Sequence, residues 1–222
     1  MGTLAGKEEG KGLPRGRHHL PAEEARARQR ARILRATLSA VGELGHRATT
    51  MREIARRAHV SLSAVYGHFP DKETCVLTAV DEAMDALPAT VEEHLAALGD
   101  SALPSEQLRE AIRANLAFFA SEPELARAFH LELRAAGPEA RGRYFAILAR
   151  FAERGRELHR RGDPEGAART PDLAYEAAVG AIEQLVAARI HAGRTDELPE
   201  LTDDAVRIAR ALAGRPGGRF AR

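Results

Sequence analysis

The chain has 222 residues, of which 44% are apolar and 29% are charged, and its formal net charge is +1. It has no run of 18 apolar residues, which excludes a membrane-spanning helix, and the N-terminal segment lacks the apolar stretch of a signal peptide. A single cysteine, Cys75, excludes an internal disulfide and fits a reducing compartment, so we expect a cytoplasmic protein in which Cys75 is a small buried residue rather than a redox sensor.

The charge is unevenly distributed along the chain. Residues 1–72 contain 14 Lys and Arg against 7 Asp and Glu, whereas residues 73–222 contain 19 against 25. A cationic N-terminal part on an acidic remainder indicates a polyanionic partner that is bound at one end only. The alternative is a basic face that is merely solvated.

Residues 1–21 are rich in Gly, Pro and basic residues and predict a disordered basic arm. Lys7, Lys11, Arg15 and Arg17 would reach DNA phosphates or a minor groove, as the arms of homeodomains do. The alternatives are an unused tail or an extension from a misplaced start codon.

The next segment, residues 22–70, predicts a three-helix unit. Ile33, Leu34, Leu38 and Val41 form the inner stripe of a helix over 22–44, which Gly45 ends. Thr50 followed by Glu53 is a capping box that begins a second helix, and Ser61 begins a third that extends to about His68. Two short helices joined by a tight turn predict a helix-turn-helix, whose second helix enters a DNA major groove.

The stretch TTMREIARRAHVSLSAVYGHFPDKE, residues 49–73, resembles the TetR family of bacterial transcriptional regulators. The resemblance is strong over about residues 25–90 and is limited to helix order beyond them. It implies an all-α fold of nine or ten helices, with a DNA-binding head and a ligand-binding body. One departure is His59, where members often have Gly; a left-handed backbone is expected there, which His tolerates better than most residues.

The predicted DNA contacts are of two kinds, because phosphate contacts position a protein and base-edge contacts specify sequence. Thr49 and Thr50 begin a helix, where free N–H groups favour an anion. The resemblance implies phosphate contacts for Tyr66, His68 and Lys72. The start of the third helix should read base edges. The full expected set is Thr49, Thr50, Arg52, Ser61, Leu62, Ser63, Ala64, Tyr66, His68 and Lys72. Val65 and Phe69 are expected in the core instead.

Residues 71–213 predict a helical body. Helices are expected from Asp71 to a break at Pro88, then over 89–98, from a cap at Ser105, over 123–136, 139–161 and 171–192, and from Thr202 to about Ala213. Residues 162–170 are expected to be a polar loop and residues 214–222 a frayed tail.

The body should hold a small-molecule effector, as the resemblance implies. The candidate pocket residues are Phe119, Phe129, Leu133, Tyr144, Leu148, Phe151, Tyr175 and Glu183, with His130, Tyr144 or Glu183 orienting the ligand. Aromatic residues at helical spacing are also ordinary core, and that alternative stays open.

The helix over 171–192 is apolar on more than one side, so it must be buried on more than one side. Packing against a second copy of the chain achieves this, and the resemblance implies pairing through the last two long helices. The predicted dimer interface is Val179, Ile182, Val186, Ile190, Ile208 and Leu212. The alternative is a central helix of a monomeric bundle.

The sequence has no HExxH, CxxC or Gly-rich phosphate loop, so we expect no enzyme activity, metal or cofactor. The resulting hypothesis is a homodimeric, ligand-responsive repressor that binds a near-palindromic operator in double-stranded DNA and is released by an effector of unknown identity. Its half-sites would lie roughly one helical turn (~34 Å) or a multiple apart. The alternatives are a helical small-molecule-binding or protein-interaction module without sequence-specific DNA binding, or a cofactor-independent enzyme.

Overall fold

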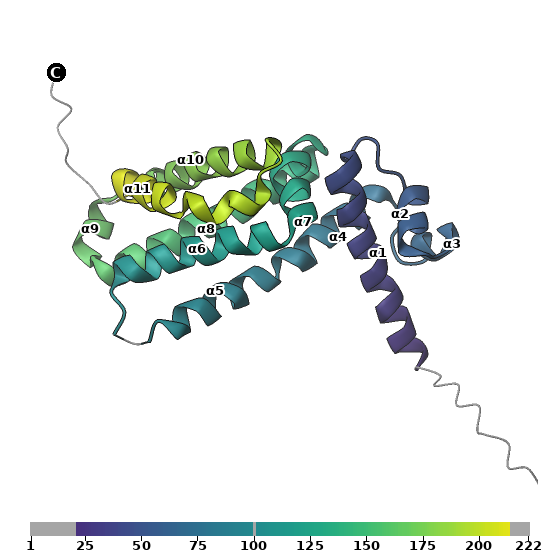
Figure 1. Cartoon of the computed structure of the whole chain (residues 1–222), viewed down its shortest axis with the longest axis horizontal. Helices are drawn as coiled ribbons and strands as arrows, with labels where there is room; N and C mark the ends of the chain where they lie inside the picture. The colour runs from purple at the N-terminus through teal and green to yellow at the C-terminus, as the bar shows by residue number, and fades with distance from the viewer. Residues whose placement is uncertain (1–20, 100, 214–222) are drawn as a thin grey trace, which may run out of the picture.

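The computed structural model describes residues 21–99 and 101–213, and these residues form helices and no strand. This confirms the all-α prediction. Figure 1 shows a small head made of α1–α3 and a longer bundle, the body, which α4 joins to the head. The predicted arm and frayed tail lie outside the described residues, apart from Pro21. In the described part of the chain, no helix combines the length and apolar character needed to cross a bilayer.

The head consists of α1 (Ala22–Leu44), α2 (Met51–Ala58) and α3 (Leu62–Tyr66). Its core is small and apolar, with Ile33, Ile54 and Val65 fully buried. The helix expected over 22–44 has these limits, because Gly45 adopts a positive φ of 83° that ends α1. The third helix is shorter than predicted, since it ends at Tyr66 rather than His68.

Helix α4 (Lys72–Met84) belongs to the cores of both parts. Cys75 and Ala79 pack in the head, whereas Val80 and Met84 pack in the body. Cys75 is fully buried, with its Sγ 3.1 Å from Thr37 Oγ1, and burial raises the pKa of the thiol to about 11. A neutral, enclosed thiol of this kind is a packing group, as the sequence predicted. Any tilt of α4 must therefore move the head relative to the body.

The body is an elongated helical bundle (Figure 1). Its long helices are α5 (Ala86–Ala97), α6 (Pro104–Ser121), α8 (Pro138–Gly162), α10 (Asp172–His191) and α11 (Thr202–Ala213). Shorter elements connect them: α7 (Pro123–Arg127), a π-helical turn (Ala128–Glu132), and 3-10 turns at Leu133–Ala135 and Thr195–Leu201. The predicted helix over 123–136 is thus three successive helix types rather than one.

Three local predictions for the body were wrong. The expected loop over 162–170 contains α9 (Pro164–Arg169), which Asp163 caps by accepting a hydrogen bond from Gly166 N at 2.8 Å. The break expected at Pro88 falls at Asp85 instead. Pro88 has no N–H to bond the carbonyl of Met84, four residues earlier, and its ring crowds that carbonyl, so α4 ends at Met84 and Pro88 lies in the first turn of α5. The N-cap of α6 is Leu103 rather than Ser105.

Candidate DNA-binding face and ligand cavity

The turn between α2 and α3 has the tight geometry that the sequence predicted. Thr50 Oγ1 accepts a hydrogen bond from Glu53 N at 3.2 Å and so caps α2. Ser61 Oγ accepts one from Ala64 N at 3.1 Å and caps α3. Between them His59 takes the left-handed conformation, with φ 53° and ψ 48°. The helix-turn-helix therefore forms with His in the position that glycine fits best.

The start of α3 presents polar side chains to solvent. Ser61 and Ser63 are exposed, with their hydroxyls 2.9 Å apart, and Tyr66 is 52% exposed. Leu62 and Ala64 are half-buried, while Arg52 at the start of α2 is exposed. Val65 and Phe69 are buried, as predicted. The exposed side chains share the helix-turn-helix, so one DNA groove can meet them together.

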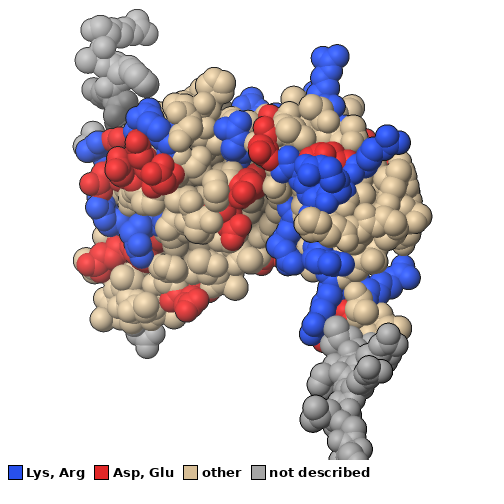
Figure 2. Space-filling model, turned by 45° about the vertical axis from the view of Figure 1, so that its right-hand side comes forward, with Lys and Arg blue, Asp and Glu red and all other residues tan. Residues whose placement is uncertain are grey.

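The head carries many basic side chains. Figure 2 shows Lys and Arg gathered over the head on the right, whereas the acidic residues lie mainly over the body. Arg56 and Arg57 are not available as unpaired cations, because both pair with Glu53, and these contacts lower the pKa of Glu53 to about 2. Arg57 also pairs with Glu43, so these two Arg and two Glu carry no net charge together, and the positive potential available to a polyanion must come from the remaining basic residues.

Three predicted phosphate contacts have internal partners. The predicted DNA contact of Thr49 is wrong for its side chain. Thr49 is 1% exposed and its Oγ1 donates to Gly45 O at 2.8 Å, so the side chain cannot reach DNA in this conformation. His68 Nε2 lies 2.9 Å from Gln29 Oε1, and burial, with nearby Arg26 and Arg30, lowers the pKa of His68. Lys72 Nζ donates to His46 O at 2.8 Å. His68 and Lys72 thus help to hold the head together.

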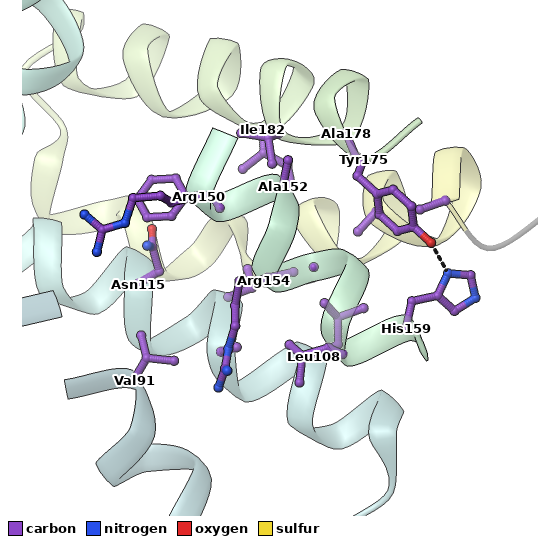
Figure 3. Close-up of a pocket in the computed structure, with 18 of the residues that line it drawn as sticks. Val91, Leu108, Asn115, Arg150, Ala152, Arg154, His159, Tyr175, Ala178 and Ile182 are labelled. Atoms are coloured by element: carbon purple, nitrogen blue, oxygen red, sulfur yellow. Dashed lines mark hydrogen bonds between the residues drawn. The ribbon is translucent and has the colours of Figure 1, made fainter. Parts of the chain in front are cut away.

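The body encloses an apolar cavity of about 730 Å³ between α4, α5, α6, α8, α10 and α11. Figure 3 shows Val91, Leu108 and Ile182 facing this space from three different helices. Arg150 and Arg154 also line it, and Arg154 pairs with Glu92. The size and the apolar lining are typical of a site for one small molecule.

The cavity separates the predicted pocket residues into two groups. Leu148, Phe151, Tyr175, Glu183 and also His130 line it. Phe119, Phe129, Leu133 and Tyr144 do not, which corrects their assignment: each is at most 1% exposed and packs in the adjoining core. Sequence analysis missed the lining residues of α4 and α5, Met84, Leu87 and Val91, because their apolar spacing is that of ordinary core.

Two polar contacts lie in the wall of the cavity. Near its outer end, His159 Nδ1 is 2.8 Å from the hydroxyl of Tyr175 (Figure 3). Near the head, His130 Nδ1 lies 2.7 and 2.9 Å from the two carboxylate oxygens of Glu183, which also accepts a hydrogen bond from Tyr144 at 2.7 Å. In residues 21–99 and 101–213, no group of three His, Cys, Asp or Glu side chains is arranged to hold a metal ion.

The predicted dimer interface is partly wrong. Val186 and Ile190 are 3% and 0% exposed within one protomer, and Val179, Ile182 and Val186 line the cavity. This face of α10 is buried by its own chain. The opposite face carries exposed Ala177, Gly180, Leu185 and Ala188, and α11 adds exposed Leu212 and half-buried Ile208. Helix α10 is apolar on two sides, as the sequence indicated, and Val186 and Ile190 lie on the side that its own chain covers.

The fold and these two sites define a helix-turn-helix regulator with a ligand-sized cavity. The family described as "Bacterial regulatory proteins, tetR family" matches residues 33–79, and the "Tetracyclin repressor-like, C-terminal domain" matches residues 101–187. The chain belongs to the tetR family of bacterial transcriptional regulators.

Relatives of known name support this placement. The transcriptional regulator BetI of Burkholderia thailandensis is 30% identical over 132 residues, which cover 52% of this chain and 67% of BetI. The repressor KstR of Mycolicibacterium smegmatis is 33% identical over 76 residues, 34% of this chain and 37% of KstR. A solved structure of FadR from Bacillus subtilis in complex with stearoyl-CoA has a TM-score of 0.69 at 21% identity, covering 84% of this chain and 99% of FadR, and shows the shared fold alone.

Proposed function

We propose that this protein is a homodimeric, ligand-responsive repressor that binds a near-palindromic operator and is released when a small molecule fills the cavity. The observation that carries the proposal is the position of α4, which lines the cavity through Met84 and packs in the head through Cys75. A ligand that favours one tilt of α4 changes the placement of the head, and so shifts the population between DNA-binding and released states.

The operator contacts that remain after the structural corrections are Thr50, Arg52, Ser61, Leu62, Ser63, Ala64 and Tyr66. Lys72 stays in the proposed set through the ammonium hydrogens that its bond to His46 leaves unused. His68 does not, because the Nε2–H of its neutral ring is directed at Gln29 and its Nδ1 can only accept. Ser63 can donate to or accept from a base, and Ala64 can meet a thymine methyl. Tyr66 would donate to a phosphate, which positions the head without reading sequence.

The proposed dimer uses the outer faces of α10 and α11. Exposed Ala177, Gly180 and Ala188 let two copies of α10 approach closely, and Leu185 and Leu212 supply apolar area at their edges. An exposed apolar stripe of this kind on a helical bundle indicates an interface. A two-fold pair would present two heads to two half-sites, which requires an operator with matching symmetry.

The test is selection of bound sequences from random double-stranded DNA, followed by binding of the selected sequence at increasing salt concentration. The proposal predicts an inverted repeat and an affinity that falls steeply as salt displaces the phosphate contacts. Enrichment of no sequence, or binding that is indifferent to salt, would refute it and would favour a ligand-binding or protein-interaction module. Addition of candidate small molecules to the bound complex then tests release.

A further inference from the structure

The interior of the cavity is apolar over most of its length. Side chains from three helices line it, among them Leu108, Ile112, Phe151 and Ile182. Along α6 the lining extends from Pro104 to Leu116, and twelve residues of α-helix span about 18 Å. A space of this form fits an elongated apolar chain.

The end of the cavity nearest the head offers no partner for a charged ligand group. Glu183 and His130 line the cavity there, but they are only 7% and 4% exposed and they bond to each other. The side chains around them, such as Leu116 and Val186, are apolar. Because an unpaired charge is strongly disfavoured away from water, a charged group of the ligand must lie where the cavity meets solvent.

The cavity reaches the surface between α5 and α8. Glu92 of α5 and Arg154 of α8 both line it, and their side chains are 62% and 34% exposed. These two side chains form an ion pair, which joins the two helices across the opening. Figure 3 shows Arg154 extending from α8 toward the helix that carries Val91. We call Glu92, Arg150 and Arg154 the rim of the cavity.

The rim carries more positive than negative charge. Arg150 lies four residues before Arg154 on α8, so both side chains project from the same side of the helix. Arg150 also lines the cavity and is exposed, and within the part of the chain that the structure describes it forms no ion pair. Asp81 of α4 does not line the cavity and pairs with Arg143 at 3.2 Å. Two guanidinium groups thus face one carboxylate at the rim.

The outer end of the cavity, near α9, has no such excess of positive charge. Asp163 and Arg210 line the cavity there, and both are exposed. Their charges are opposite, and the Asp163 carboxylate is engaged by Gly166 N at 2.8 Å. An anion is therefore favoured at the rim between α5 and α8 rather than at the outer end.

We propose that the cavity takes an elongated amphiphile whose apolar chain fills the interior and whose anionic head group, a carboxylate or a phosphate, binds Arg150 and Arg154 at the rim. The guanidinium fork matches two oxygens of such a group. The head group competes with Glu92 for Arg154, so ligand binding exchanges the ion pair that joins α5 to α8. This proposal deepens the proposed function, since it rests on the cavity being the effector site.

The test measures the dissociation constants of decanoate, decyl phosphate and decanamide by calorimetry. Decanamide has the shape of decanoate without its charge, so both anions should bind more tightly than the amide. This preference should fall by roughly 3- to 10-fold in Arg150→Gln and in Arg154→Gln, a range between that of an exposed ion pair and that of a hydrogen bond to a charged group. Whichever of the two anions binds more tightly identifies the head group.

The matched control is Arg141→Gln. Arg141 is exposed on the same helix but does not line the cavity, and it lies nine residues, about 13.5 Å, before Arg150. This distance exceeds the screening length of about 8 Å at physiological salt, so the preference should be unchanged. Glu92→Gln removes the competing carboxylate and should strengthen decanoate binding by roughly 3- to 10-fold. Impaired folding cannot produce that gain.

Equal affinities of the unaltered protein for decanoate and decanamide would overturn the proposal. Failure to bind any of the three probes, or a preference for anions that survives both arginine substitutions, would overturn it as well. None of these measurements involves DNA. If decanoate bound at the rim but did not release the operator, the proposed function would be contradicted while the assignment of the anion site would stand.

Discussion

Glu132 Oε2 accepts a hydrogen bond from the backbone N–H of His46 at 2.8 Å and so joins the body to the head across 86 positions of sequence. Lys72 Nζ donates to the carbonyl of the same residue at 2.8 Å. Both backbone polar groups of His46, its N–H and its C=O, are thus held by charged side chains. Glu132 ends the π-helical turn that carries His130, so the turn that lines the cavity also holds the loop between α1 and α2.

We predict that Glu132→Ala uncouples the head from the cavity. A hydrogen bond to a charged group contributes about 1.5 to 3 kcal/mol, so the variant should lose stability of that order in urea unfolding. Operator binding should persist, but its response to a ligand should weaken. Glu93→Ala, which removes an exposed carboxylate from the middle of α5, is the control and should change neither property. If Glu132→Ala responded to the ligand as strongly as the unaltered protein, coupling through the Glu132–His46 hydrogen bond would be excluded.

Gly42 marks a close approach of the head to the body. A Cβ there would lie 2.8 Å from Glu124 O and 2.9 Å from Glu124 Cα, both backbone atoms of α7. Gly42→Ala should therefore destabilise the protein by about 1 to 3 kcal/mol, as overpacking does. Gly142→Ala on α8 meets nothing within 4 Å and should stabilise it by up to about 1 kcal/mol through helix propensity. If Gly42→Ala and Gly142→Ala had equal midpoints in thermal unfolding, the contact between Gly42 and α7 would not be tight.

His59 carries the one positive φ among the non-glycine residues that the structure describes. Replacement by Gly removes a left-handed cost of about 1 to 2 kcal/mol but adds entropy to the unfolded chain, so we expect His59→Gly to gain up to about 1 kcal/mol. His59→Val should lose stability, since β-branched residues fit this conformation poorly. The melting temperature of His59→Gly should lie above that of the unaltered chain, and that of His59→Val below it. The reverse order would show that the backbone at His59 is not strained.

The proposed interface predicts a change of oligomeric state. Leu185 on α10 is 36% exposed and Leu98 at the end of α5 is 37% exposed, so they form a matched pair. Leu185→Glu should place a charge in the proposed dimer interface and shift the protein toward monomers, as measured by analytical ultracentrifugation. Leu98→Glu should remain dimeric. A dimer that survives Leu185→Glu would indicate another interface.

The sequence predicted the helical elements better than the site. The limits of α1 follow from local signals, since Gly45 supplies the positive φ that ends it. Apolar spacing also assigned Val65 and Phe69 to the core. Spacing shows which side of a helix is turned inward, but not whether that side meets another side chain or an empty volume. Phe119 and Phe151 therefore looked alike, although Phe151 alone of the two lines the cavity.

The same limit applies to the predicted dimer interface. Val186 and Ile190 were assigned to a second copy because α10 is apolar on both sides, and only the three-dimensional packing reveals which side its own chain covers. The contacts among His130, Tyr144 and Glu183 could also not be predicted from the sequence, because the fold brings these residues together from three elements. Their separate positions in the sequence carry no shared pattern.

The account depends most on the head binding DNA through the helix-turn-helix, and one substitution tests this directly. Tyr66 is 52% exposed on α3 and Phe145 is 55% exposed on α8, so truncation of either to alanine leaves the core intact. In a mobility-shift titration with selected operator DNA, Tyr66→Ala should weaken binding by roughly 10- to 100-fold, the value of one hydrogen bond to a charged phosphate, and Phe145→Ala should bind like the unaltered protein. Equal affinities for the two variants would contradict the account.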